Sequence, residues 1–210
     1  PVEMLKLTPL RLSGVPPPMA HCEVAMDANI VDVAFSRTGE RIAVLTRDNF
    51  SVFAWSIKQR PVPEPMLESS YPLPTATENR PRQIAFLNEN EVYVLTHRES
   101  GKSQIERTAL ETRESKVVYE AAEGEHVQRI FSSLCHRNLW FSKLSASGIV
   151  TYSRVIQSDA GDYGVEDWAN SPPADTHWAY AVRIGEDQVR YKSIGSPPLL
   201  TVSGRLGRAF

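Results

Sequence analysis

A short apolar pattern returns along this chain at nearly regular intervals, and this recurrence limits the fold more than any other feature of the sequence. Each copy ends in an aromatic residue, and these four residues are 51, 45 and 49 positions apart: Phe35, Phe86, Phe131 and Tyr180. In the first three copies a second apolar run follows after six to eight residues. Paired strands that repeat every 45 to 50 residues are typical of the stacked four-stranded blades of a β-propeller. The recurrence therefore predicts an all-β fold with WD40-like blades, a fold used more for interaction than for catalysis.

The best-defined copy of the repeat runs from residue 29 to residue 57. Residues 31–35 alternate apolar and other side chains, which predicts a half-buried strand. Residues 41–45 form a nearly continuous apolar run that suits a strand buried on both faces. Residues 50–55 are expected to be the third strand. Turn-forming residues separate these runs, so this copy accounts for most of one blade.

The rest of the chain predicts further blades with irregular connections. Residues 58–81 contain six prolines, which favour a loop with room for one outer edge strand near residues 66–71. The acidic, glycine-containing segment 159–167 is also expected to be a loop. The expected domains are a strand and proline-rich junction at residues 1–20 and part of a propeller at residues 21–210. Its blades are expected at residues 29–75, 82–121, 126–158 and 177–210.

The number of expected blades, three to four, determines whether the propeller can close into a ring. A propeller ring usually has four to eight blades, and an open row of blades exposes strand edges that pair with other chains. We therefore expect an incomplete propeller that belongs to a longer protein. The apolar N-terminal run, residues 4–12, is expected to be either the last strand of a preceding domain or the closing strand of this one.

Composition argues against several classes of function. The 23 Lys and Arg residues nearly balance the 25 Asp and Glu residues, which does not favour a domain that grips nucleic acid through its own surface. The two cysteines do not make the disulfide framework of a secreted domain, so a reducing compartment is expected. No apolar stretch reaches the 18 residues of a membrane-spanning helix.

Motifs that carry chemistry are few. His21–Cys22 and Cys135–His136 could be combined into a zinc site, but zinc ligands are usually spaced and neighbouring strand residues point to opposite faces. The acidic segment 159–167 lacks the alternating ligands of a calcium-binding loop. The chain has no nucleophile elbow and no phosphate-binding or dinucleotide-binding glycine motif. We therefore expect no catalytic residue, no cofactor and no metal.

The four tryptophans are the remaining candidates for a functional role. Trp55 and Trp140 fall in expected strands, where packing between blades is the ordinary use. Trp168 and Trp178 flank a proline-rich loop. Exposed aromatic residues are over-represented at protein interfaces, so these two are candidates for a partner contact, with burial in the fold as the alternative.

One segment carries a more specific signal. Leu7-Thr-Pro-Leu-Arg11 is followed by Val15-Pro-Pro-Pro-Met19 and then by expected strands that end at Phe35, Leu45 and Trp55. This order resembles the Elongator complex protein 1 family, the largest scaffold subunit of the Elongator complex, at the start of its second propeller. The triple proline followed by Met is the specific element. The likeness is good over residues 7–57 and looser over residues 80–185, and residues 186–210 depart from the family pattern.

The resemblance implies a non-catalytic scaffold. Members of that family have two N-terminal propellers, a helical repeat region and a C-terminal dimerisation region, and a separate subunit of their complex catalyses 5-carboxymethyl-type modification of the tRNA wobble uridine. The implied partners are the other Elongator subunits, without a membrane contact. Contact with tRNA and homodimerisation are implied only for regions outside this piece. The implied location is the cytoplasm, with the nucleus as a second site.

Two other classes of function stay open at this point. An unrelated cytosolic propeller adaptor, for instance in vesicle trafficking, would share the blades and have no link to tRNA. A catalytic propeller would need a polar central channel lined by His or Asp side chains. The expected inner strands are apolar, and the main exceptions are Asp32 and Arg129.

Overall fold

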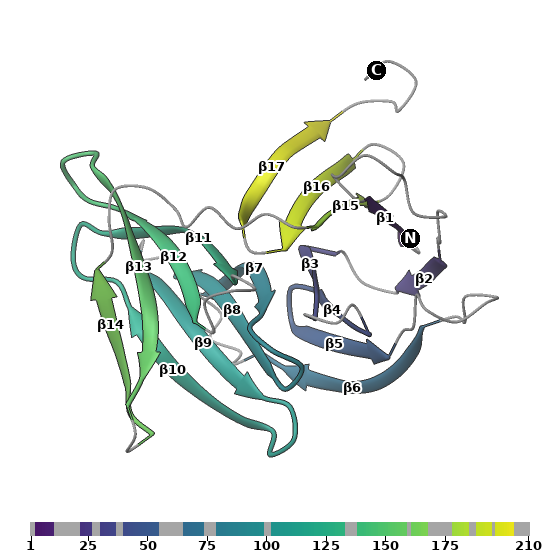
Figure 1. The fold of residues 1–210 in the computed structure, drawn as a ribbon, viewed down its shortest axis with the longest axis horizontal. Helices are drawn as coiled ribbons and strands as arrows, with labels where there is room; N and C mark the ends of the chain where they lie inside the picture. Colours follow the sequence, from purple (N-terminus) through teal and green to yellow (C-terminus); the bar gives the residue numbers. More distant parts are fainter. Residues whose placement is uncertain are drawn as a thin grey trace.

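The described part of the chain consists of strands and their connections, without a helix, in a computed structural model (Figure 1). The strands form four antiparallel sheets around a common centre. This confirms the predicted all-β partial propeller. The structure describes residues 3–10, 22–26, 30–36, 40–54, 65–73, 79–98, 102–132, 138–158, 161–167, 178–184, 188–194 and 196–203.

Three of the sheets have four strands each, and in each the strands follow one another in chain order. The first sheet contains β3 (Asp32–Phe35), β4 (Arg41–Leu45), β5 (Asn49–Ala54) and β6 (Met66–Pro72). The second contains β7 (Asn79–Phe86), β8 (Glu91–Arg98), β9 (Ser103–Ala109) and β10 (Glu114–Glu120). The third contains β11 (His126–Ser132), β12 (Leu139–Leu144), β13 (Val150–Gln157) and β14 (Tyr163–Asp167). Their first strands, β3, β7 and β11, lie side by side at the centre (Figure 1).

The fourth sheet joins strands from both ends of the described chain. Its strand order is β17-β16-β15-β1-β2. The strands are β1 (Glu3–Leu10), β2 (Cys22–Met26), β15 (Trp178–Ile184), β16 (Gln188–Ile194) and β17 (Ser196–Ser203). β1 pairs with β15, and β17 contacts the inner strand β11. The innermost strand of this sheet is thus its last in sequence, the reverse of the other three sheets. The division into a junction and a propeller domain stays a prediction.

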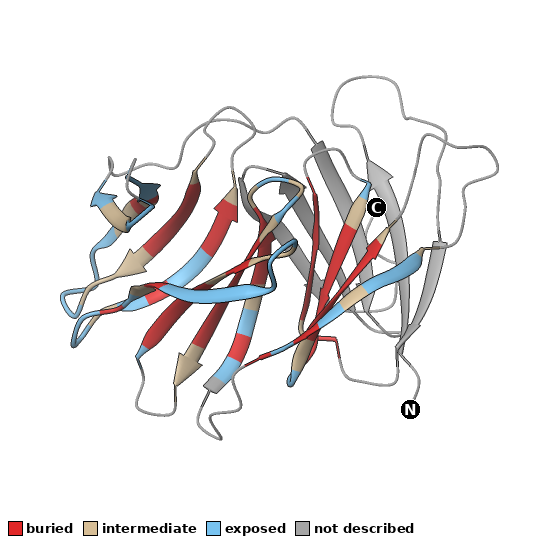
Figure 2. Cartoon of the chain, turned by 90° about the horizontal axis from the view of Figure 1, so that it is seen from below, coloured by how far each residue is buried: buried red, intermediate tan, exposed pale blue. Residues whose placement is uncertain are grey.

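Two expectations about strand burial have different outcomes. The prediction that residues 41–45 are buried on both faces is confirmed, since Ile42 to Leu45 are fully buried in β4. The prediction of a half-buried first strand is wrong, because all four residues of β3 are buried, with Asp32 only 2% exposed. The physical reason is that β7 of the next sheet covers β3. Exposed residues lie mainly on the outermost strands β6, β10 and β14 (Figure 2).

Two segments expected to be loops contain strand residues. The prediction for residues 159–167 is wrong for β14, which pairs with β13 from Tyr163 opposite Gln157 to Asp167 opposite Ser153. The proline-rich loop was expected to reach residue 81, but β7 begins at Asn79. A bulge between Pro81 and Gln83 lets this strand include a residue that has no N–H group to donate. The edge strand expected near residues 66–71 is confirmed as β6.

Two layers of apolar core lie between neighbouring sheets in the part of the chain whose side chains are described. We call the layer between the first and second sheets the first seam and the layer between the second and third sheets the second seam. The first seam contains Ala34, Ala43, Leu45, Phe50, Val52, Tyr71, Leu73, Ile84, Phe86, Val92 and Val94. The second seam contains Ala85, Tyr93, Leu95, Ile105, Val118, Val127, Ile130, Leu139, Phe141 and Val155.

The second sheet contributes to both seams. Its strand β8 sends Val92 and Val94 into the first seam and Tyr93 and Leu95 into the second. Successive side chains of a strand point to opposite faces, so an uninterrupted apolar run is what a sheet covered on both faces requires. This packing fixes the positions of the strand ends and turns that carry the polar contacts.

Candidate functional site

The partner contact predicted from the sequence rests on two tryptophans whose side chains lie outside what the structure describes. Trp168 lies outside the described residues. Trp178 begins β15, where its backbone lies opposite Ile194, and its side chain is outside what the structure describes. Their role stays a prediction. Trp140, which was expected to pack between blades, is fully buried in β12, and the Arg154 guanidinium carbon lies 5.8 Å from its ring centroid.

Three of the four residues considered for a zinc site lie outside the described part of the chain. Cys22 lies in β2, while His21, Cys135 and His136 are outside the described residues. Within the described residues, no group of three or more His, Cys, Asp or Glu side chains could hold a metal ion.

The acidic side chains of β14 are engaged by cations of the same sheet. Glu166 accepts two hydrogen bonds from Arg154, at 2.8 and 2.6 Å. Asp167 pairs with Lys143 at 2.8 Å and accepts a hydrogen bond from the Ser153 hydroxyl at 2.7 Å. The Lys143 and Ser153 hydrogen bonds lower the pKa of Asp167. These oxygens therefore stabilise a strand pair and do not converge on one ion.

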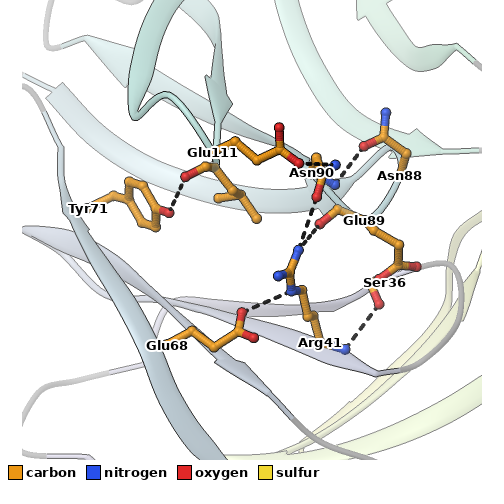
Figure 3. Close-up of polar contacts among 9 residues, drawn as sticks. Ser36, Arg41, Glu68, Tyr71, Asn88, Glu89, Asn90 and Glu111 are labelled. Atoms are coloured by element: carbon orange, nitrogen blue, oxygen red, sulfur yellow. Dashed lines mark hydrogen bonds and ion pairs between the residues drawn. The ribbon is translucent and has the colours of Figure 1, made fainter.

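Arg41 is the centre of the polar contacts at the rim of the first seam (Figure 3). From β4 it reaches the turn between β7 and β8, where its Nη1 donates to the Glu89 carbonyl oxygen at 2.7 Å and to Asn90 Oδ1 at 3.1 Å. Its Nε pairs with Glu68 of β6 at 2.9 Å. A guanidinium group presents five donors in a rigid fork, so one side chain can hold three partners on two sheets.

Two further contacts extend this rim. Asn90 Nδ2 donates to Glu111 Oε1 at 2.8 Å, which ties two turns of the second sheet to each other. The Tyr71 hydroxyl of β6 donates to the Leu110 carbonyl at 3.0 Å. The Tyr71 ring also stacks on Phe50, with centroids 4.8 Å apart. The edge strand β6 is therefore attached to the second sheet as well as to its own.

Arg107 is the corresponding cation of the second seam. It pairs with Glu91 of the neighbouring strand β8, and its Nε donates to Glu91 Oε1 at 2.6 Å. Tyr163 of the third sheet covers the pair, with its ring centroid 5.4 Å from the guanidinium carbon of Arg107. The arginine and glutamate side chains are only 17% and 16% exposed. Burial, with Glu91 as the next cause, raises the pKa of the adjacent Tyr93, which keeps this phenol neutral.

The inner strands are joined by side chains that bind the backbone of the next strand. Asp32 Oδ2 accepts a hydrogen bond from the Ile84 N–H of β7 at 3.0 Å, and Gln83 Oε1 accepts one from the Ile130 N–H of β11 at 2.9 Å. Val127 of β11 is held at both polar groups: its N–H donates to Ser103 Oγ at 3.0 Å, and its carbonyl lies 3.0 Å from His97 Nε2. Burial lowers the pKa of His97, and the neighbouring Arg82 and His126 lower it further. A neutral His97 can donate this hydrogen bond from Nε2.

This geometry makes a rigid body of neighbouring sheets. Comparison with known protein families identifies the family to which these blades belong. A family model described as the ELP1 N-terminal second beta-propeller matches residues 3–206. The chain belongs to this family. The match confirms the resemblance predicted from the sequence around Val15 to Met19.

Solved structures similar to this member of the ELP1 second-propeller family are distant in sequence. Hsv2 from Kluyveromyces lactis is 14% identical, with a TM-score of 0.43 over 83% of this chain and 48% of that chain. Sqt1 from Saccharomyces cerevisiae is 10% identical, with a TM-score of 0.40 over 84% of this chain and 48% of that chain. The WD40 domain of SCAP from fission yeast is 10% identical, with a TM-score of 0.45 over 90% of this chain and 45% of that chain. The chain thus spans about half the length of these three chains. No curated protein matches it.

The chemistry available to this propeller follows from its side chains. Among the described residues, the phenols of Tyr93 and Tyr119 have strongly raised pKa values, with burial as the first cause, and the Tyr119 hydroxyl donates to Glu125 at 3.1 Å. The described residues include no helix long and apolar enough to cross a membrane. Sequence reasoning singled out Asp32 and missed Gln83, Arg41 and Arg107. An alignment of the inner strands could have found Gln83, because it holds the place in β7 that Asp32 holds in β3.

Proposed function

We propose that this chain is part of a non-catalytic scaffold subunit of the Elongator complex and supports assembly for 5-carboxymethyl-type modification of the tRNA wobble uridine. The observation that carries the proposal is the match of the ELP1 second-propeller family over residues 3–206. The catalytic step belongs to a separate subunit of the complex.

The contacts between sheets support a scaffold role in physical terms. Both seams are closed by buried apolar side chains and by arginines with several partners. Such a body holds its turns at fixed relative positions, so a partner that binds several turns does not have to order them first. The proposed partners are the other Elongator subunits, with Trp168 and Trp178 as candidate contacts. Contact with tRNA and homodimerisation are assigned to regions outside this piece, and the proposed location is the cytoplasm and the nucleus.

An adaptor of vesicle trafficking would use the same blades without any link to tRNA. The family match does not favour it, because the matched model describes one particular propeller of one protein family. The adaptor function becomes the favoured alternative if the following experiment refutes the Elongator assignment.

The test is mass spectrometry of tRNA nucleosides from source cells in which this gene is deleted. We expect loss of the 5-carboxymethyl-type wobble uridines and their return when the gene is restored. A tagged protein should also co-purify the catalytic subunit of the complex, which separates a scaffold from an indirect effect. Normal levels of these nucleosides in the deletion strain would refute the proposal.

A further inference from the structure

Three exposed basic side chains lie on the inner strands of the second and third sheets. Arg82 of β7 and His126 and Arg129 of β11 are exposed, and their side chains make no hydrogen bond or ion pair within the described part of the chain. Six other cations of the three four-stranded sheets are paired with carboxylates: Arg41, Arg98, Lys102, Arg107, Lys143 and Arg154. Lys116 and Arg113 have no such pair among the described residues. We call Arg82, His126 and Arg129 the inner basic cluster.

The two arginines of this cluster lie on adjacent inner strands, each at or beside a bulge. The register of β7 shifts between Pro81 and Gln83, which leaves Arg82 as the extra residue, and the register of β11 shifts just before Arg129. The hydrogen bond from the Ile130 N–H to Gln83 Oε1 joins the residues that directly follow the two arginines. Bulges redirect side chains and recur near functional sites. The same local distortion therefore presents a guanidinium group on each of two adjacent inner strands.

His97 lies within the electrostatic reach of this cluster. His97 of β8 reaches β11 through the Val127 carbonyl at 3.0 Å. Arg82 and His126 both lie close enough to His97 to lower its pKa, in addition to the larger effect of burial. The electrostatic field of the cluster is thus felt at a neighbouring side chain.

Arg129 breaks the pattern in which an inner-strand side chain accepts a hydrogen bond from the next inner strand. Asp32 and Gln83 each accept a hydrogen bond from the next inner strand. Arg129 holds the place in β11 that Gln83 holds in β7, since each follows a bulge and precedes the residue whose N–H is bound. A guanidinium group has donors only and cannot accept such a bond. The neighbouring strand β17 has no carboxylate in its sequence Ser-Pro-Pro-Leu-Leu-Thr-Val-Ser. Arg129 therefore meets no carboxylate on this strand and is open to an acceptor from solvent or from a partner.

We propose that the inner basic cluster is a docking site for a carboxylate-rich segment of a partner protein. The inference rests on the proposed scaffold function and names the kind of partner this surface takes. Arginine binds carboxylates through paired hydrogen bonds, and two arginines on adjacent strands can hold neighbouring Asp or Glu side chains of one segment.

A short acidic segment fits the surroundings better than a nucleic acid does. The cluster is bordered along the chain by Glu120 at the end of β10 and by Glu123 and Glu125 in the connection to β11. A phosphate backbone that extends beyond the cluster would meet these acids, whereas a few carboxylates can stay within it. The near balance of charge over the whole chain also provides little general attraction for a polyanion.

The test is the binding of a fluorescein-labelled ten-residue polyglutamate peptide to the purified 210-residue chain at low salt, measured by fluorescence anisotropy. We expect R82E/R129E to weaken binding by about tenfold or more, because reversal of two contact charges turns attraction into repulsion. The matched control is R113E, which reverses an exposed arginine in the turn between β9 and β10, at the opposite end of the second sheet. Its affinity should stay within about twofold of wild type, since a remote exposed charge is screened.

Three results would overturn the proposal: equal affinity of R82E/R129E and wild type, equal weakening by R113E, or binding of ten-nucleotide oligothymidylate in place of the peptide. Circular dichroism checks that each variant is folded, and the milder R82Q/R129Q serves if the double reversal unfolds the chain. The result is independent of the nucleoside assay. Absent peptide binding with lost wobble modification refutes only the docking site, and peptide binding with normal modification refutes only the Elongator assignment.

Discussion

The two seams bury apolar side chains in the same way, but their arginines are placed differently. In the first seam Arg41 crosses from one sheet to the next and binds the backbone carbonyl of Glu89 and the side chain of Asn90, while 30% of its own side chain is exposed. In the second seam Arg107 stays within its sheet, pairs with Glu91 and is covered by the Tyr163 ring of the neighbouring sheet.

This difference determines which seam depends more strongly on its charges. Water can reach the partners of Arg41, so the loss of this side chain leaves acceptors that can be solvated. The partners of Arg107 are covered, so its loss would leave the Glu91 carboxylate in a poorly hydrated place. A carboxylate deprived of its partner there costs more than a half-exposed hydrogen bond contributes. The seams should therefore respond alike to apolar truncation and unequally to removal of arginine.

Truncation of a buried apolar side chain should lower the free energy of unfolding most. It tests the apolar packing that the two seams share. Phe141 in the second seam is fully buried and its ring lies 4.7 Å from that of Tyr119, while Phe50 in the first seam is also buried. We expect Phe141→Ala and Phe50→Ala each to lower the free energy of unfolding by about 3–5 kcal/mol. Urea unfolding measures the change. The exposed Ile149 is the control, and Ile149→Ala should stay within about 0.5 kcal/mol of wild type. If the loss in free energy of unfolding at either Phe is close to that of the Ile149→Ala control, the seam that contains this Phe is not packed as described.

Removal of the covered arginine should come next and separate the two seams. We expect Arg107→Met to lower the free energy of unfolding by about 3 kcal/mol, because it removes the cation that pairs with Glu91 beneath Tyr163 and leaves the Asn88 amide as the side-chain donor to this carboxylate. The second substitution Glu91→Met should recover part of this loss in the double variant. Urea unfolding of both single variants and the double variant gives the coupling energy. A double variant as unstable as the two single losses added together would show that the pair does not act as a unit.

The strand repeat could be predicted from the sequence because burial between sheets leaves a strong apolar pattern. β4 and β8 are buried on both faces, and their runs Ile42 to Leu45 and Val92 to Leu95 are almost wholly apolar. β14 escaped prediction for the opposite reason. It is an outer strand with charged and glycine residues, and its pairing depends on cross-strand contacts with Arg154 and Ser153 that are distant in sequence.

The polar contacts could be predicted only in part. Asp32 stood out as a charged residue in an apolar strand, but its partner is a backbone N–H group 52 residues away, at Ile84. Arg41 looked like an ordinary strand-start residue, since nothing local indicates that the turn at Glu89 lies within its reach. Sequence patterns report which face of a strand is apolar, whereas contacts across a seam depend on how whole sheets are placed.

Removal of the exposed-rim arginine should have a smaller effect and sharpen the contrast with Arg107. We expect Arg41→Met to lower the free energy of unfolding by about 1 kcal/mol, since Met keeps most of the apolar stem and water replaces the lost donors. Hydrogen exchange should also become faster at the turn between β7 and β8, where Arg41 binds Glu89 and Asn90. A loss equal to that of Arg107→Met would show that exposure does not explain the difference between the seams.

The smallest effect should come from His97, which gives the second seam a dependence on pH. Burial lowers the folded-state pKa of His97 below its ordinary value of 6.5. Below pH 6.5 the unfolded chain therefore binds a proton that the folded chain does not, so stability is lost as the pH falls from about 7 toward 5. His97→Gln keeps a donor for the Val127 carbonyl and removes the titration. The gap in free energy of unfolding between variant and wild type should therefore shift in favour of the variant as the pH falls. Urea unfolding at a series of pH values measures this gap. Because both proteins retain Glu106, whose pKa burial raises and whose effect on stability has the opposite sign, the gap isolates His97. A gap that does not change with pH would mean that His97 titrates alike in the folded and unfolded chains and that the second seam does not shield it.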